Sequence, residues 1–104
     1  MLLQSQHNAR IHAAATVLVV ATGVLARLSA IEWALIALAI AGVWTAEALN
    51  TTIEFLTDLV SPEFHPLAGK VKDVAAGGVL AAAIGATVVG GFVFGPHVLR
   101  LLER

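Results

Sequence analysis

The chain of 104 residues has little charge and no cysteine. Charged residues make up 12% of it and hydrophobic residues 59%, whereas a soluble domain carries about 25% charged residues. Disorder is excluded because it requires low hydrophobicity and high charge. The lack of cysteine excludes disulfides, zinc–thiolate sites and thiol nucleophiles, and a net charge of −1 gives no basic field for nucleic acid. The composition predicts a small integral membrane protein.

Long segments without Asp, Glu, Lys or Arg predict how the chain crosses the membrane. A spanning helix needs about 20 mainly apolar residues, and the uncharged segments are 11–26, 33–46 and 74–99. The second segment is too short alone, so its helix must continue through charged positions. Ser29 is a suitable N-cap for that helix, and Pro62 and Pro96 are expected to end the second and third helices. We predict an all-α membrane protein with one membrane-embedded domain over residues 1–104 and transmembrane helices at about 8–28, 31–60 and 67–95.

Four polar residues, which we call the polar stripe, lie on one face of the second predicted helix: Glu47, Asn50, Glu54 and Asp58. Their spacing confines them to an arc of about 80°. A charge at the bilayer centre costs at least about 2.5–3.5 kcal/mol, so the polar stripe is expected to face a cavity, bind cations or lie near the interface. Carboxylates suit Mg²⁺, which takes one or two of them together with water and substrate phosphates. The alternative is the solvated end of a long helix, which fits Asp58 better than Glu47.

The two lysines follow the predicted break between the second and third helices. Lys72 and Asp73 are expected about two turns into the third helix, level with the polar stripe of its antiparallel neighbour. A lysine beside carboxylates and a metal suits phosphate binding. Lys70 is interpreted as an anchor at the membrane surface. It is not part of a Walker motif, because Val71 follows it where that motif has Ser or Thr.

Small residues recur at every fourth position of the third predicted helix: Gly78, Ala82, Ala86 and Gly90. Such spacing lets helices approach closely in lipid. Three helices alone enclose a polar site poorly. We therefore expect an oligomer with its sites at subunit contacts.

Two runs resemble the signature of the prokaryotic diacylglycerol kinase family, which includes the undecaprenol kinases. The first is EALNTTIE at 47–54 followed by Asp58, and the second is HPLAGKVKDVAAG at 65–77. The pattern is E-x-x-N-(S/T)-x-(I/V)-E-x-x-x-D, then a Lys-Asp pair at the head of the third helix. The segment NARIH at 8–12 resembles the start of the family's first helix. The similarity covers about residues 6–96.

The resemblance implies a homotrimer of three-helix subunits in the bacterial cytoplasmic (inner) membrane. Its sites would be shared between subunits at the cytoplasmic face. The implied reaction is Mg²⁺- and ATP-dependent phosphorylation of a membrane lipid hydroxyl, converting diacylglycerol to phosphatidic acid. Undecaprenol is the alternative substrate within the family.

The resemblance also implies roles for individual residues. Glu47 matches the proposed general base, and Glu54 matches a metal-binding glutamate. Gln6 stands where the family often has a second metal-binding glutamate, and its amide oxygen can coordinate without bringing charge. The remaining matches are ATP- or phosphate-binding positions (Asn50, Lys72, Asp73) and supporting positions (Asp58, His65, Gly69, Arg10).

Two hypotheses from other classes remain open. A small oligomeric ion or proton transporter would use Glu47 as its titrating group. That hypothesis explains one buried carboxylate, but it does not explain Glu54, Lys72 and Asp73 together. A non-catalytic membrane adaptor is the second alternative, and thermal stabilisation by Mg²⁺ and ATP would argue against it.

Overall fold

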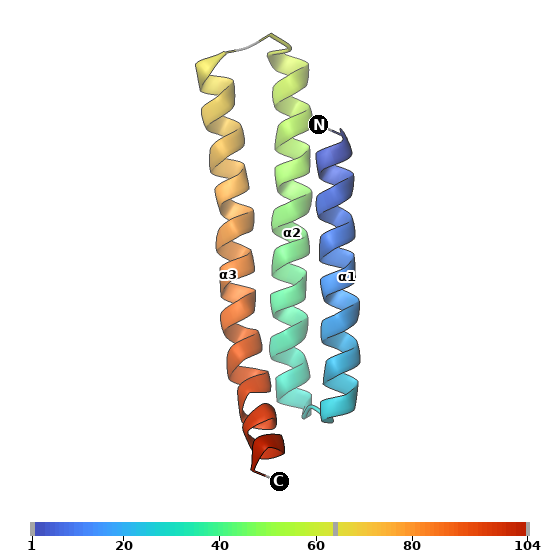
Figure 1. The fold of residues 1–104 in the computed structure, drawn as a ribbon. Helices are drawn as coiled ribbons and strands as arrows, with labels where there is room; N and C mark the ends of the chain where they lie inside the picture. The colour runs from blue at the N-terminus through green and yellow to red at the C-terminus, as the bar shows by residue number, and fades with distance from the viewer. Residues whose placement is uncertain (1, 64, 104) are drawn as a thin grey trace.

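Three long helices form an elongated up-down-up bundle (Figure 1). The structure is a computed structural model that describes residues 2–63 and 65–103, with side chains from Ala9 onward. The helices are α1 (Leu2–Ala26), α2 (Ala30–Val60) and α3 (Pro66–Leu102). The bundle measures 59 × 22 × 19 Å, and each helix is long and apolar enough to cross a membrane. The predicted all-α transmembrane architecture is confirmed.

The turn from α1 to α2 is fixed by backbone hydrogen bonds and by a capping box. Arg27 has a φ of 55°, and the amides of Arg27 and Leu28 donate to the carbonyls of Val24 and Gly23. This pattern is a Schellman ending, in which a left-handed residue closes the helix. It ends α1 at Ala26, so the predicted end at residue 28 was wrong by two residues.

Ser29 is the N-cap of α2, as predicted. Its hydroxyl accepts from the Glu32 amide at 3.2 Å, and the Glu32 carboxylate accepts from the Ser29 amide at 3.0 Å. Two amides that have no partner inside the helix are satisfied in this way. At the other end α2 stops at Val60, with Ser61 as its C-cap directly before Pro62. The predicted proline break is confirmed.

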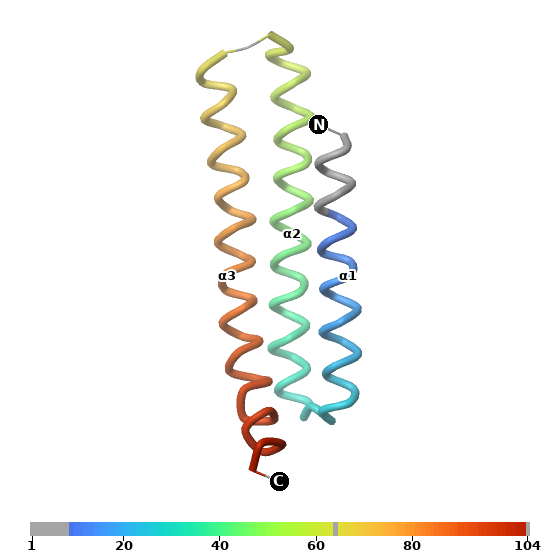
Figure 2. Tube along the Cα trace, viewed as in Figure 1, coloured from blue at the N-terminus to red at the C-terminus, as the bar shows by residue number. Residues whose placement is uncertain are grey.

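The third helix is longer than predicted. It continues through Pro96 to Leu102, so the expected end at residue 95 was wrong. Proline removes one amide from the helical ladder, but the other amides keep their bonds if the helix continues, which a membrane strongly favours. The path of α3 changes direction near its C-terminal end (Figure 2). Beyond the proline, the Arg100 Nε donates to the Pro96 carbonyl at 3.4 Å.

The small apolar core lies near the α1–α2 turn. It consists of Leu28, Ile36 and Val93, which are 3–8% exposed. Elsewhere large apolar side chains face outward, with Leu25 84% and Phe92 81% exposed. Exposing this apolar surface to water would cost free energy, because the transfer of apolar area out of water is favourable. These faces therefore suit lipid or other transmembrane helices. The core also lies at the opposite end of α2 from the polar stripe.

Candidate active site

The polar stripe is buried most deeply at the end nearest the middle of α2. Glu47 is 5% exposed and Asn50 is 6% exposed, while Glu54 and Asp58 are half-buried. The Asn50 Nδ2 donates to the Glu54 Oε1 at 3.4 Å. The polar stripe therefore lies on the packed side of α2, and its members become more accessible toward Val60.

Three oxygen atoms in the deep part of the polar stripe lack a hydrogen-bond donor among the described residues. They are both carboxylate oxygens of Glu47 and the Oδ1 of Asn50. The Nε2 of His12 lies 3.3 Å from the Glu47 Oε2, but the two groups are not aligned as a hydrogen bond. A buried acceptor without a donor costs about 1–3 kcal/mol, and more if it is charged. This arrangement is therefore suited to receiving a cation or a hydroxyl proton.

The described residues fit a Mg²⁺ ion only if phosphate groups of a substrate complete its ligand shell. Across residues 9–63 and 65–103, no three His, Cys, Asp or Glu side chains gather as a metal cage. Mg²⁺ seldom needs such a cage, because it is bound by one or two carboxylates plus substrate phosphates. The Glu54 carboxylate and the unsatisfied Oδ1 of Asn50 are oxygen donors of this kind. The side chain of Gln6 lies outside the described residues, so its role stays a prediction.

Lys72 reaches the polar stripe from α3. Its Nζ donates to the Asp58 Oδ1 at 2.7 Å, and the two side chains are 32% and 42% exposed. The predicted level of Lys72 beside the polar stripe is therefore confirmed. Asp73, the next residue, is exposed and makes no hydrogen bond or ion pair within the described part of the chain. This chain thus brings Lys72, but not Asp73, to the polar stripe.

The other predicted supporting residues make local contacts or face outward. His65 is the N-cap of α3, and its Nδ1 accepts from the Leu67 amide at 3.1 Å. A Cβ added at Gly69 would meet no atom of the described residues within 4 Å, so packing against those residues does not require glycine there. Arg10 is exposed on α1, and no described side chain pairs with it. Their roles at the site stay predictions.

A group that sequence reasoning missed joins α1 to α2 beside Glu47. The Trp44 indole donates to the Thr16 hydroxyl at 3.0 Å, and that hydroxyl donates to the His12 carbonyl at 2.7 Å. The rings of His12 and Trp44 meet edge to face, with centroids 6.1 Å apart. The available signal was a histidine inside an apolar helix, because ionisable residues at membrane depth commonly have a function.

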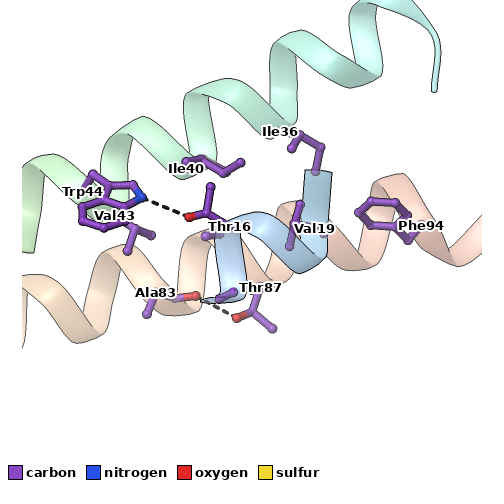
Figure 3. Close-up of a pocket in the computed structure, with 13 residues that line it drawn as sticks. Thr16, Val19, Ile36, Ile40, Val43, Trp44, Ala83, Thr87 and Phe94 are labelled. Atoms are coloured by element: carbon purple, nitrogen blue, oxygen red, sulfur yellow. Dashed lines mark hydrogen bonds between the residues drawn. The ribbon is translucent and has the colours of Figure 1, made fainter. Parts of the chain in front are cut away.

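An apolar pocket begins at the same tryptophan and runs between the three helices (Figure 3). Its volume is about 380 Å³. Thr16 and Trp44 form one end, and Phe94 lies at the other end of the close-up. The remaining lining is alanine, glycine and branched aliphatic residues, apart from Thr87. Such a lining is suited to hydrocarbon.

Comparison with known proteins identifies the family. A model described as prokaryotic diacylglycerol kinase matches residues 1–94. The chain is 42% identical to an undecaprenol kinase of Bacillus subtilis (strain 168), over 91% of this chain and 77% of that protein. It is 43% identical to a diacylglycerol kinase of Synechocystis sp., over 94% of this chain and 57% of that protein, and so spans little more than half of that relative. These matches confirm the predicted resemblance: the chain belongs to the prokaryotic diacylglycerol kinase family and is a membrane lipid kinase.

Proposed function

We propose that this chain transfers the γ-phosphoryl group of ATP to the hydroxyl of a membrane lipid, in the presence of Mg²⁺. One observation carries the proposal: Glu47 is a buried carboxylate for which the described residues supply no hydrogen-bond donor. It lies on the same helix face as the side-chain oxygens of Asn50 and Glu54 and as Asp58, which binds Lys72. Seven residues separate Glu47 from Glu54, which is about 10 Å along an α-helix. This distance suits a base at the lipid and metal-binding groups at the nucleotide.

Phosphoryl transfer requires mainly positioning and charge neutralisation. Glu47 takes the proton of the lipid hydroxyl while the hydroxyl oxygen attacks the γ-phosphorus and ADP leaves. Lys72 neutralises negative charge on the phosphate oxygens, because its ammonium is a flexible point charge that lies beside Asp58 of the polar stripe. Mg²⁺ would be held by Glu54 and Asn50, and it would supply further charge neutralisation at the phosphates.

Diacylglycerol is the acceptor that we propose first. A second acceptor, undecaprenol, has support from one observation: the undecaprenol kinase relative is matched over a larger share of its length than the diacylglycerol kinase relative. Both lipids present a primary hydroxyl on a hydrocarbon body. The lining of the apolar pocket beside Thr16 and Trp44 suits a hydrocarbon segment of either lipid.

We further propose that the chain works as a homotrimer with shared sites. Gly78 is exposed, and a Cβ added there would meet no atom of the described residues within 4 Å, so α3 is open at this small residue within one subunit. Asp73 is also exposed rather than turned to its own polar stripe. A neighbouring subunit would use both features. We place the nucleotide end of the site at the cytoplasmic face of the bacterial inner membrane, because ATP is available there.

The test is phosphate transfer from radiolabelled ATP in mixed micelles, with diacylglycerol and undecaprenol assayed side by side. We expect label in one of the two lipids, its loss on chelation of Mg²⁺, and its recovery when Mg²⁺ is restored. Glu47→Gln and Glu54→Ala should each lower the rate by about 10²-fold or more. Glu63→Gln is the matched control, since Glu63 is exposed in the loop after α2. Helical circular dichroism verifies folding of each variant.

Two outcomes would contradict the proposal. Transfer that survives both the Glu47 and the Glu54 substitution would show that the polar stripe is not the site. Absence of transfer to any lipid, together with proton flux through proteoliposomes without ATP, would favour the transporter.

A further inference from the structure

We infer that His12 is a positioning residue for Glu47, holding one oxygen of its carboxylate so that the other is free to take the hydroxyl proton. This inference rests on the proposed function of Glu47 as the general base. His12 contacts Glu47 from a different helix, across 3.3 Å between Nε2 and Oε2. The two side chains are only 19% and 6% exposed, so water competes little for this contact.

The carboxylate determines which nitrogen of His12 carries a proton. A carboxylate accepts hydrogen bonds and cannot donate them when ionised. The favourable tautomer of His12 therefore has its proton on Nε2, facing the Glu47 Oε2. In this form the Nε2–H of His12 is a donor directed at the Glu47 carboxylate.

The imidazole ring is itself held in place. Trp44 lies edge to face with it, and the Trp44 indole is tied to the Thr16 hydroxyl at 3.0 Å. Thr16 donates its own proton to the His12 carbonyl at 2.7 Å. These contacts join α1 to α2 in a closed group of residues around the contact with Glu47. A ring held by Trp44 on a helix backbone bonded to Thr16 can orient the carboxylate that it faces.

The two oxygens of Glu47 differ in their surroundings. Both are buried without an aligned hydrogen-bond donor among the described residues, but Oε2 has the Nε2 of His12 at 3.3 Å. Oε1 is thus the acceptor that remains for a lipid hydroxyl. Hydrogen bonds at active sites are often poorly aligned without substrate and tighten when it binds. The misaligned approach of His12 at 3.3 Å fits this behaviour.

The experiment compares two replacements of His12. His12→Phe keeps a flat ring against Trp44 but removes the donor. His12→Gln supplies an amide donor at similar reach. We expect His12→Phe to lower kcat about tenfold, because small misplacements of a reacting group are costly, with the KM for ATP unchanged within about twofold. We expect His12→Gln to recover kcat to within about threefold of the wild type.

His97 provides a matched control at the other end of the bundle. Its Nε2 lies 2.9 Å from the Glu32 Oε2, so His97→Phe also removes a histidine–glutamate contact between two helices. A merely structural loss would lower the unfolding midpoint in both histidine-to-phenylalanine variants. Only His12→Phe should lower kcat at constant KM for ATP.

The outcomes separate this inference from the proposed function. An inactive wild-type protein would contradict the lipid kinase assignment of the site itself. An active wild type with an equally active His12→Phe would overturn the role of His12. Equal losses of kcat in His12→Phe and His12→Gln would overturn the donor role as well. If His12→Phe does not fold by circular dichroism, His12→Leu replaces it in the same comparison.

Discussion

The Nζ of Lys72 lies 2.7 Å from the Oδ1 of Asp58, and this contact joins α3 to the accessible end of the polar stripe on α2. Both side chains are partly exposed. An ion pair of that kind contributes about 0–1 kcal/mol to stability. Lys72 is therefore expected to matter for chemistry much more than for folding.

Lys72→Met should lower kcat/KM for ATP by about tenfold or more, since phosphate charge then lacks its ammonium partner. The free energy of unfolding should change by less than about 1 kcal/mol. Both are measured on the purified protein in detergent. Lys70→Met is the control, because Lys70 is exposed and lies two residues before Lys72, about 200° away around α3. Equal losses of activity in the two variants would contradict a specific role for Lys72.

Thr16→Val should destabilise the contact between α1 and α2. The substitution leaves the Trp44 indole, which donates to the Thr16 hydroxyl, without its acceptor. A fully buried donor without a partner costs about 1–3 kcal/mol, and Trp44 is half-buried, so we expect a loss of about 1 kcal/mol. Thr22→Val is the control, since Thr22 is exposed and bonds only to the Leu18 carbonyl of its own helix. Unfolding in a detergent titration, followed by circular dichroism, should separate the two; the same midpoint for both would refute the expectation.

Gly23→Ala should disturb the α1–α2 turn. A Cβ at Gly23 would lie 2.7 Å from the Trp33 Cη2 and 3.0 Å from the Leu28 Cδ1. Forced overpacking of this kind costs about 1–3 kcal/mol. Gly42→Ala meets no atom within 4 Å, and it should be neutral or stabilising by up to about 1 kcal/mol. Thermal unfolding of both variants checks this, and a Gly23→Ala protein as stable as Gly42→Ala would count against the packing at the turn.

Arg27→Gly should stabilise the protein by about 1–2 kcal/mol. Arg27 has a φ of 55°, a left-handed conformation that costs an L-residue about this much and glycine almost nothing. Arg27→Ala removes the guanidinium but keeps the unfavourable φ, so it should not stabilise. The unfolding midpoints decide the matter, and a gain in Arg27→Ala equal to that in Arg27→Gly would assign the effect to charge instead.

The helices were predictable where single residues control the backbone. Ser29 and Pro62 marked a start and an end because a cap and a proline act locally. The ends at Ala26 and Leu102 were not predictable in this way. The first depends on an arginine adopting a conformation typical of glycine. The second depends on a helix continuing past Pro96, where proline chemistry alone favours a stop.

The candidate site was predictable where one helix sets the geometry. The spacing of Glu47 to Asp58 fixes their shared face, and antiparallel packing then brings Lys72 to the same level. The contact of His12 with Glu47 was not predictable, because it depends on the rotation of α1 about its own axis. The described part of α1 is apolar nearly all round, so no amphipathic pattern indicates which face turns inward.

The depth of the polar stripe has a consequence for how two immiscible reactants meet. A hydrocarbon layer about 30 Å thick covers about 20 helical residues, so a layer that begins at Ala30 ends near Asn50. Glu47 would then lie just inside the hydrocarbon layer, and Glu54 and Asp58 would lie on its aqueous side. A lipid alcohol could react without leaving its own phase, and so could a nucleotide. The α2 helix would then act as an interfacial catalyst, holding groups for each reactant on that reactant's own side of the boundary.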